Sequence, residues 1–287
     1  MLNDLDYLKM RRLSADIRIQ TVEALCAAGF GHIGGAASIA DVLGVLYGGV
    51  MNIRPQEPAW PERDWLVLSK GHTGPALYAA LALSGYFPLE WLRTVNKPGT
   101  RLPSHCDRKR TPGIDMTTGS LGQGISAAVG IAIANRMQGK ESYTYCIIGD
   151  GETNEGEVWE AAACAAHQRL DHLILFVDWN KKQLDGALEQ ICDPGDLAQK
   201  FAAFGFYAQT VRGYDAPAIC GGVIKAKASR DKPAAIILDT LKGLGISFAE
   251  RADFNHYMAV DRILADEAIA EIERRFAAGT FPWGERQ

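Results

Sequence analysis

The chain has 287 residues, with 30 basic and 34 acidic side chains and a formal net charge of −4. This near balance provides no basic surface for nucleic acid or anionic lipid, so we expect neither as a partner. With 47% hydrophobic and 22% charged residues, the composition is typical of a globular protein and excludes a disordered or fibrous one.

The first half of the chain has five predicted elements. These are helices over 2–28, 38–47, 74–84 and 125–137, and a strand over 65–68. Gly29 and Gly31 end the first helix, and the next glycine-rich segment, GHIGGAAS, is predicted to be a loop. An uncharged run over 116–135 is long enough to span a membrane, but its four glycines and polar residues indicate a loop that leads into a buried helix.

The second half alternates between apolar strands and helices. The predicted strands are 143–148, 172–178, 206–211 and 234–241, and the predicted helices are 157–170, 196–204, 216–229 and 262–278. Continuous apolar strands separated by helices predict a parallel sheet with helices on both faces. We therefore expect an α/β fold with a single domain over 1–287, an N-terminal helix within 1–30, and a terminal helix and tail over 261–287.

The six cysteines are irregularly spaced and include no C-x-x-C pair, which indicates reduced thiols rather than a disulfide framework or a zinc ribbon. The N-terminal residues mix charges with leucines and lack the apolar core of a signal peptide. We expect a cytoplasmic protein without membrane contact.

Polar residues follow two of the predicted strands. Asp150 lies between two glycines directly after the strand over 143–148, and Asn180 follows the strand over 172–178. Parallel sheets bind ligands beyond the carboxyl ends of their strands, and carboxylate and amide oxygens suit a divalent ion that shares phosphate oxygens. The helix that starts near Glu155 directs its N-terminus to the same place, which favours an anion. The alternative is that the glycines form a tight turn and Asn180 caps it.

Two other motifs are weaker. Gly122, Gly124 and Ala127 match the dinucleotide fingerprint G-x-G-x-x-G/A, but no strand precedes them, so a nicotinamide cofactor is not expected. His32, His72 and His105 each lie in a predicted loop, where a histidine can move protons or bind phosphate and hydroxyl groups. No paired His/Cys spacing predicts a zinc site.

Six motifs occur in one order along the chain. They are GHIGG at Gly31, LSKGHTGPALY at Leu68, TPGIDMTTGSLGQG at Thr111, GDGETNEGEVWEA at Gly149, DWNKKQLDG at Asp178 and LKGLGISF at Leu241. Together they resemble the N-terminal, thiamine-diphosphate-binding half of transketolase, and specifically the separately encoded N-terminal subunit of split transketolases. The resemblance runs from about residue 13 to about residue 261.

The resemblance implies a cofactor site. Asp150, Asn180 and the backbone carbonyl of Lys182 would bind Mg²⁺, or Ca²⁺ or Mn²⁺, which holds the diphosphate of thiamine diphosphate. The other cofactor-binding positions implied by the resemblance are His72 and His256 near the phosphates, Gly149 and Gly151 where the chain approaches them, and Gly119 and Leu121 around the aminopyrimidine.

The resemblance also implies the reaction, which is transfer of a two-carbon ketol unit from a ketose phosphate to an aldose. His32, His72 and His105 match histidines that line the sugar channel, and Glu155 and Glu160 match acidic residues that face the neighbouring subunit. Several positions depart from the family pattern, and most of them flank the proposed substrate histidines, which suggests an unusual sugar. These positions are Ile33, Ser104, Cys106, Lys182 and Tyr257.

The chain is too short to contain the pyrimidine-binding domain of the family. We therefore expect the partner to be a C-terminal transketolase subunit, in a two-plus-two heterotetramer. The alternatives are a subunit of another thiamine diphosphate enzyme, of the 2-oxo acid dehydrogenase or deoxyxylulose phosphate synthase type, or a non-catalytic cofactor-binding subunit.

Overall fold

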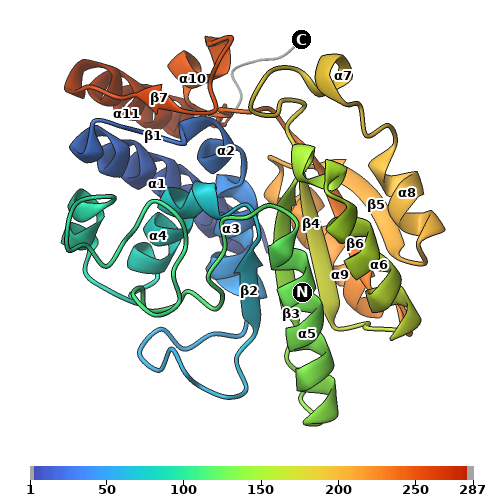
Figure 1. The fold of residues 1–287 in the computed structure, drawn as a ribbon. Helices are drawn as coiled ribbons and strands as arrows, with labels where there is room; N and C mark the ends of the chain where they lie inside the picture. Colours follow the sequence, from blue (N-terminus) through green and yellow to red (C-terminus); the bar gives the residue numbers. More distant parts are fainter. Residues whose placement is uncertain (1–2, 283–287) are drawn as a thin grey trace.

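The computed structural model describes residues 3–282, and its centre is a five-stranded sheet in the order β2-β3-β4-β6-β5 (Figure 1). All four neighbouring pairs are parallel, which confirms the predicted α/β class. The strands are β2 (Trp65–Leu68), β3 (Thr144–Gly149), β4 (Leu173–Trp179), β5 (Tyr207–Arg212) and β6 (Ala234–Asp239).

Helices cover both faces of this sheet. Alternate strand residues face opposite ways, so that Ile147 packs in one core and Ile148 in the other. The first core lies under α1 (Asp4–Ala28), α3 (Ala40–Val45), α4 (Gly74–Leu83) and α9 (Ala216–Ala228). The second lies under α5 (Gln123–Met137), α6 (Gly156–His167) and α8 (Leu197–Ala203). In Figure 1, α5 and α6 are seen in front of the sheet.

A third apolar cluster joins the two ends of the chain. α11 (Arg262–Ala277) packs along α1, and β1 (Phe30–Gly31) pairs antiparallel with β7 (Met258–Ala259). The remaining short elements are α7 (Leu188–Ile191), α10 (Ser247–Arg251), the 3₁₀ helices η2 (Gly71–Thr73), η3 (Leu89–Thr94) and η4 (Gly151–Asn154), and the π-helical turn η1 (Leu46–Val50).

One prediction in the N-terminal part was wrong. The expected loop GHIGGAAS contains a helix, α2 (Ile33–Ser38), whose six residues are all buried. A Cβ atom at Gly34 would lie 2.3 Å from the carbonyl oxygen of Asn255, so the glycine allows a close contact that outweighs its poor helix propensity. The helix predicted over 38–47 is present as α3 and the start of η1, and the backbone leaves the helical conformation at Gly49, which has φ of 152°.

The other predicted elements agree with the structure to within a few residues at their ends. The parts of the N-terminal helix and the C-terminal tail predicted at residues 1–2 and 283–287 lie outside the described residues. Over residues 3–282, no helix combines the length and the apolar character that crossing a membrane requires.

Candidate active site

A cavity of about 330 Å³ opens beyond the carboxyl ends of β3 and β4, which is where parallel sheets bind ligands. Its walls contain every site residue predicted from the sequence except Glu160, which is exposed on α6. They also contain charged residues that the sequence patterns did not single out. The histidines and charged or polar side chains in the walls include His32, His72, His105, His256, Lys70, Lys242, Asp150, Glu152, Asn180 and Lys182.

Asp150 lies at the floor of this cavity and is 2% exposed. Its carboxylate accepts hydrogen bonds from the backbone N–H groups of Gly151, at 2.8 Å, and Lys181, at 2.7 Å. Lys181 has a left-handed backbone conformation, with φ of 68°, which is uncommon for a non-glycine residue. Burial, and then the charge of Asp178, raise the pKa of Asp150 to about 7. A cation bound here would relieve both effects.

Asn180 and Lys70 meet on a second buried carboxylate, that of Asp178. The side-chain amide of Asn180 donates to Asp178 Oδ2 at 2.7 Å, and the Lys70 ammonium forms an ion pair with the same oxygen. Asp178 Oδ1 has no hydrogen-bond partner among the described residues. Because the amide nitrogen of Asn180 is held by Asp178, its Oδ1 atom faces away and accepts from the N–H of Lys182 at 3.1 Å.

Lys242 also lines the cavity and is 3% exposed. Its ammonium donates to the carbonyl oxygens of Lys182, at 3.1 Å, and Gln183, at 3.2 Å, and its Nζ lies 3.1 Å from His256 Nδ1. Burial, and then the charge of Lys70, lower the pKa of Lys242 to about 8. Both lysines could have been identified from the sequence as candidate site residues, because they lie in the motifs SKGHTG and LKGLG, each of which follows a strand.

Four histidine rings that line the cavity pack together. His32 is central, with its ring centroid 5.2 Å from that of His72, 5.8 Å from that of His105 and 5.1 Å from that of His256. Burial lowers the pKa of His32 to about 4 and that of His256 to about 3, and it lowers the pKa of His72 and His105 as well. All four are therefore neutral at pH 7 and can exchange protons at their ring nitrogens.

Residues that depart from the family pattern surround these histidines. The Tyr257 ring packs edge-on against His32, with centroids 5.0 Å apart, and also contacts Phe30. Cys106 is buried, and burial raises the pKa of its thiol to about 12, so the group stays protonated. His32 therefore packs against an aromatic ring as well as against the other histidines, and the thiol of Cys106, the neighbour of His105, is unreactive.

The residues fit a metal-bound diphosphate. Asp150, Asn180 and the Lys182 carbonyl provide the oxygen donors that Mg²⁺ prefers, and such sites take further ligands from phosphate. The unpartnered oxygen of Asp178 adds negative charge beside a cation, while Lys70 and Lys242 add positive charge beside an anion. Among residues 3–282, no group of three or more His, Cys, Asp or Glu side chains is arranged to hold a metal.

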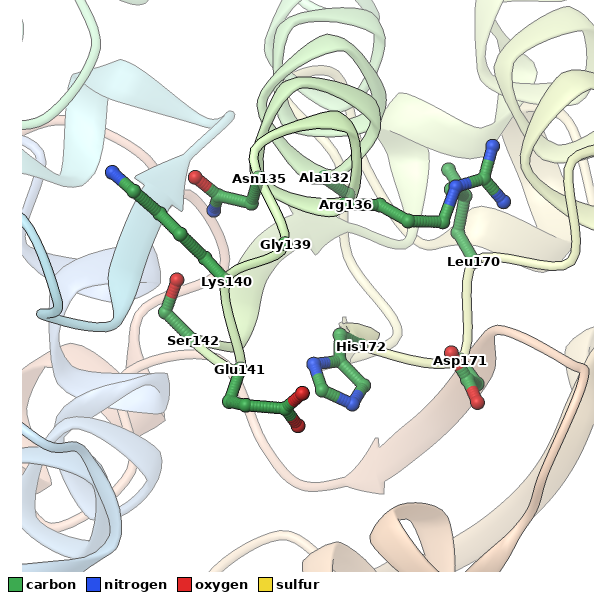
Figure 2. A pocket seen from close by; sticks show the side chains of 10 residues that line it. All are labelled: Ala132, Asn135, Arg136, Gly139, Lys140, Glu141, Ser142, Leu170, Asp171 and His172. Carbon is green, nitrogen blue, oxygen red and sulfur yellow. The ribbon is translucent and has the colours of Figure 1, made fainter.

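A second cavity, of about 200 Å³, lies at the amino ends of the strands, where α5 ends and β3 and β4 begin (Figure 2). Figure 2 shows Glu141 and His172 on one side of it, with Asn135 and Ser142 on another. Asn135 Nδ2 and Ser142 Oγ have no partner among the described residues. None of the predicted site residues lines this cavity, and acidic and basic side chains both do, which defines no ligand class.

The fold and the main cavity are those of an α/β protein whose polar residues suit a diphosphate-containing cofactor. Comparison with known proteins gives the family. The family model for the thiamine diphosphate binding domain of transketolase matches residues 10–279. The chain therefore belongs to the transketolase N-terminal family and is a transferase of the transketolase type.

Relatives and solved structures agree with this assignment. The 6-deoxy-6-sulfo-D-fructose transketolase subunit SqwG of Clostridium sp. is 52% identical over 91% of this chain and 95% of that relative. One of the subunits of the apulose-4-phosphate transketolase of Actinobacillus succinogenes is 38% identical over 88% of this chain and 92% of that relative. Transketolase from Leishmania mexicana superposes with a TM-score of 0.87 and 32% identity, over 96% of this chain and 42% of that protein.

The relatives also decide between the alternatives raised by the sequence. The matching family is transketolase rather than a 2-oxo acid dehydrogenase or deoxyxylulose phosphate synthase. The chain corresponds to nearly the whole of two separate transketolase subunits but to about two-fifths of a solved transketolase chain. It is thus homologous to the N-terminal subunits of split transketolases, which implies a partner subunit with the remaining part.

Proposed function

We propose that this chain forms the cofactor-binding half of a transketolase that transfers a two-carbon ketol unit from a ketose to an aldose with thiamine diphosphate and Mg²⁺. The main support for this proposal is that a single cavity contains the side-chain oxygens of Asp150 and Asn180 together with four neutral histidines. The first set suits a metal-bound diphosphate, and the second suits proton transfer to sugar hydroxyls.

In this proposal, Asp150, Asn180 and the Lys182 carbonyl hold the Mg²⁺. The Lys182 carbonyl already accepts from Lys242, but a carbonyl oxygen has two lone pairs and can serve both groups. Lys70 and Lys242 balance the diphosphate charge, together with His72 and His256 nearby. Gly149 and Gly151 leave room for the phosphates. When bound, thiamine diphosphate supplies the reactive carbon and the electron sink.

The remaining site residues act on the substrate and the cofactor ring. Gly119 and Leu121 shape the wall for the aminopyrimidine. His32, His72 and His105 hold the sugar hydroxyls and move protons at their ring nitrogens, because a neutral imidazole has one donor and one acceptor nitrogen. Glu155 lines the cavity and Glu160 lies exposed on α6, and both face the neighbouring subunit.

The metal assignment is tested with Asp150→Ala. Removing one of the ligands of a divalent ion should weaken Mg²⁺-dependent binding of thiamine diphosphate by about tenfold or more, which corresponds to about 1.4 kcal/mol. Asp185→Ala is the matched control, because Asp185 is exposed on the loop after β4. Calorimetry with thiamine diphosphate and Mg²⁺ measures both variants. Unchanged affinity in Asp150→Ala would show that the metal assignment is wrong.

For the substrate, we propose a ketose with an anionic sulfonate group at its far end. The support is the 52% identity to a relative named for 6-deoxy-6-sulfo-D-fructose, together with Tyr257, which packs on His32 where the family pattern has glycine. The test compares kcat/KM for 6-deoxy-6-sulfo-D-fructose and fructose 6-phosphate. Equal or better use of the phosphate would contradict the proposal.

For the assembly, we propose a two-plus-two complex with a C-terminal subunit that carries the pyrimidine-binding domain. Transfer activity should require both chains, so full activity of this polypeptide alone would refute the proposal. We also propose a cytoplasmic location, which is supported by the six unpaired cysteines.

A further inference from the structure

Glu152 is a buried acid that the proposed mechanism does not use. It directly follows the Gly149-Asp150-Gly151 motif, lies on η4, and is 2% exposed. A carboxylate this deeply buried is costly unless it is well hydrogen-bonded, and burial raises the pKa of Glu152. The hydrogen bonds to Glu152 and the nearby charge of Lys70 act in the opposite direction and lower this pKa.

Three donors from three separate segments converge on this carboxylate. Oε1 accepts from the Ser69 hydroxyl and, at 2.8 Å, from the N–H of Gly122. Oε2 accepts from the N–H of Gly149 at 3.0 Å. Ser69 follows β2, Gly122 is the N-cap of α5, and Gly149 ends β3, so a single side chain ties together its own segment and others that are 30 and 83 residues away.

Each tied segment leads directly into the cavity wall. Ser69 precedes Lys70, Gly122 follows the wall residues Gly119 and Leu121, and Gly149 precedes Asp150. Two of these segments, at Lys70 and Asp150, form the diphosphate and metal corner. The third forms the wall proposed for the aminopyrimidine. Glu152 thus joins the two halves of the proposed cofactor site.

The start of α5 depends on this contact. Gly122 has φ of 84°, and this N-cap position has no side chain of its own to accept a hydrogen bond. Helix N-termini expose backbone N–H groups that need acceptors and favour negative charge. Glu152 supplies a hydrogen-bond acceptor and a negative charge to this helix start from a different segment. The position of the aminopyrimidine wall is therefore coupled to that of the diphosphate and metal corner.

We propose that Glu152 is a positioning residue that holds the aminopyrimidine wall and the diphosphate corner at the spacing that thiamine diphosphate requires. The proposal rests on the proposed function. It requires a carboxylate, because both oxygens accept a backbone N–H. In Glu152→Gln one of these two N–H groups would face the amide NH₂, a donor, and would lose its acceptor.

The experiment compares two probes, thiamine diphosphate and inorganic diphosphate, each titrated with Mg²⁺ into the full chain with its partner subunit. Inorganic diphosphate needs only the metal corner, whereas thiamine diphosphate must also fit the aminopyrimidine wall. In Glu152→Gln the Kd for thiamine diphosphate should rise by about tenfold or more, as expected for an unsatisfied buried donor. The Kd for inorganic diphosphate should rise by no more than about threefold.

Ser69→Ala is the matched control, because it removes one hydrogen bond to Glu152 but leaves both backbone N–H groups paired. Its Kd values should change by less than about threefold for both probes. Glu152→Asp is the second variant if Glu152→Gln does not fold. Aspartate is one methylene shorter and cannot reach both segments, so it should show the same selective loss.

An equal loss for the two probes, or no loss for either, would overturn the positioning role. Urea unfolding of each variant identifies a general loss of stability, which would weaken both probes together. Failure of the proposed function gives a different result, since the wild-type complex would then not bind thiamine diphosphate at all.

Discussion

At the scale of single residues, the four clustered histidines are the clearest source of pH dependence. Their centroids lie about 5 to 6 Å apart around His32, and like charges at this distance in a buried site repel strongly. The folded protein therefore favours their neutral forms. This cluster makes the site ready for proton transfer at pH 7 at the expense of stability in acid.

We expect the free energy of unfolding to fall between pH 6.5 and 4. The pKa of His32 is about 4 and that of His256 about 3 in the folded protein, against about 6.5 when unfolded. In that range the unfolded chain binds more protons, so stability decreases as the pH falls, by at most about 1.4 kcal/mol per pH unit for each histidine. Urea unfolding at pH 7, 6 and 5 measures this dependence.

His32→Gln should reduce that dependence, because it removes one titrating group from the cluster. His167→Gln on α6 is the control, since His167 is exposed. If His32→Gln and the wild type lost the same stability between pH 7 and 5, His32 would not be held neutral by folding.

Arg18 and Asp41 form a buried ion pair between α1 and α3. Their side chains are 0% and 5% exposed, and Arg18 Nε also donates to the carbonyl oxygen of Leu244 at 2.7 Å. Asp41→Ala would leave a buried guanidinium without its counter-charge, which should cost about 3–5 kcal/mol of unfolding free energy. Urea unfolding at pH 7 measures the loss.

The control for this pair is Glu57→Ala, which breaks the exposed pair between Arg54 and Glu57. Exposed pairs contribute about 0–1 kcal/mol. A loss in Asp41→Ala as small as the loss in Glu57→Ala would mean that Arg18 is solvated or otherwise compensated.

At the residue scale, the sequence predicted the polar strand ends but not the charges behind them. Asp150 and Asn180 follow apolar strands, and this pattern was sufficient to place both in one cavity. Lys70, Lys242 and Glu152 were missed because their partners are distant in sequence. Glu152, for example, is bonded to a residue 83 positions away, and no local pattern reports such a contact.

At the scale of elements, the packing of α1 against α3 depends on a missing side chain. A Cβ atom at Gly44 would lie 2.1 Å from Ser14 Oγ and 2.8 Å from the carbonyl oxygen of Met10, both on α1. Gly44→Ala should therefore separate the two helices and cost about 1–3 kcal/mol of unfolding free energy, as measured by urea unfolding.

Gly221→Ala in α9 is the matched control for Gly44→Ala. A Cβ atom at Gly221 meets no atom within 4 Å, and alanine has the better helix propensity, so stability should be unchanged or rise by up to about 1 kcal/mol. Equal stability changes in the two variants would show that α1 and α3 adjust freely to the added methyl group.

The elements that the sequence predicted well are those with a continuous apolar pattern. The strand over 65–68 and the later strands have such runs, and their ends agree with the structure to within about two residues. α2 was missed because its glycines are typical of a loop. The reason for a glycine at position 34 is its close contact with Asn255, which is distant in the sequence. The two-residue strands β1 and β7 pair across more than 220 residues, which no local window can detect.

At the scale of the whole molecule, the candidate site residues gather at the carboxyl ends of the sheet strands. The cavity contains the proposed metal ligands, cationic side chains and histidines from segments throughout the sequence, from His32 to His256. Exposed apolar side chains lie in and around it, including Leu121, Leu184 and Tyr257. An open site with exposed apolar residues is consistent with a partner subunit that covers it.

Glu160 is exposed on α6, outside the cavity, and we propose that it faces the neighbouring subunit. Glu160→Lys reverses one charge at that contact, so it should reduce the fraction of two-plus-two complex, because a reversed charge in an interface is repelled or left unpaired. Glu267→Lys on α11, where the glutamate is also exposed, is the matched control. Light scattering of each variant mixed with the partner subunit measures the mass. A wild-type complex of one copy of each chain would contradict the proposed stoichiometry, and equal assembly of the two variants would remove Glu160 from the interface.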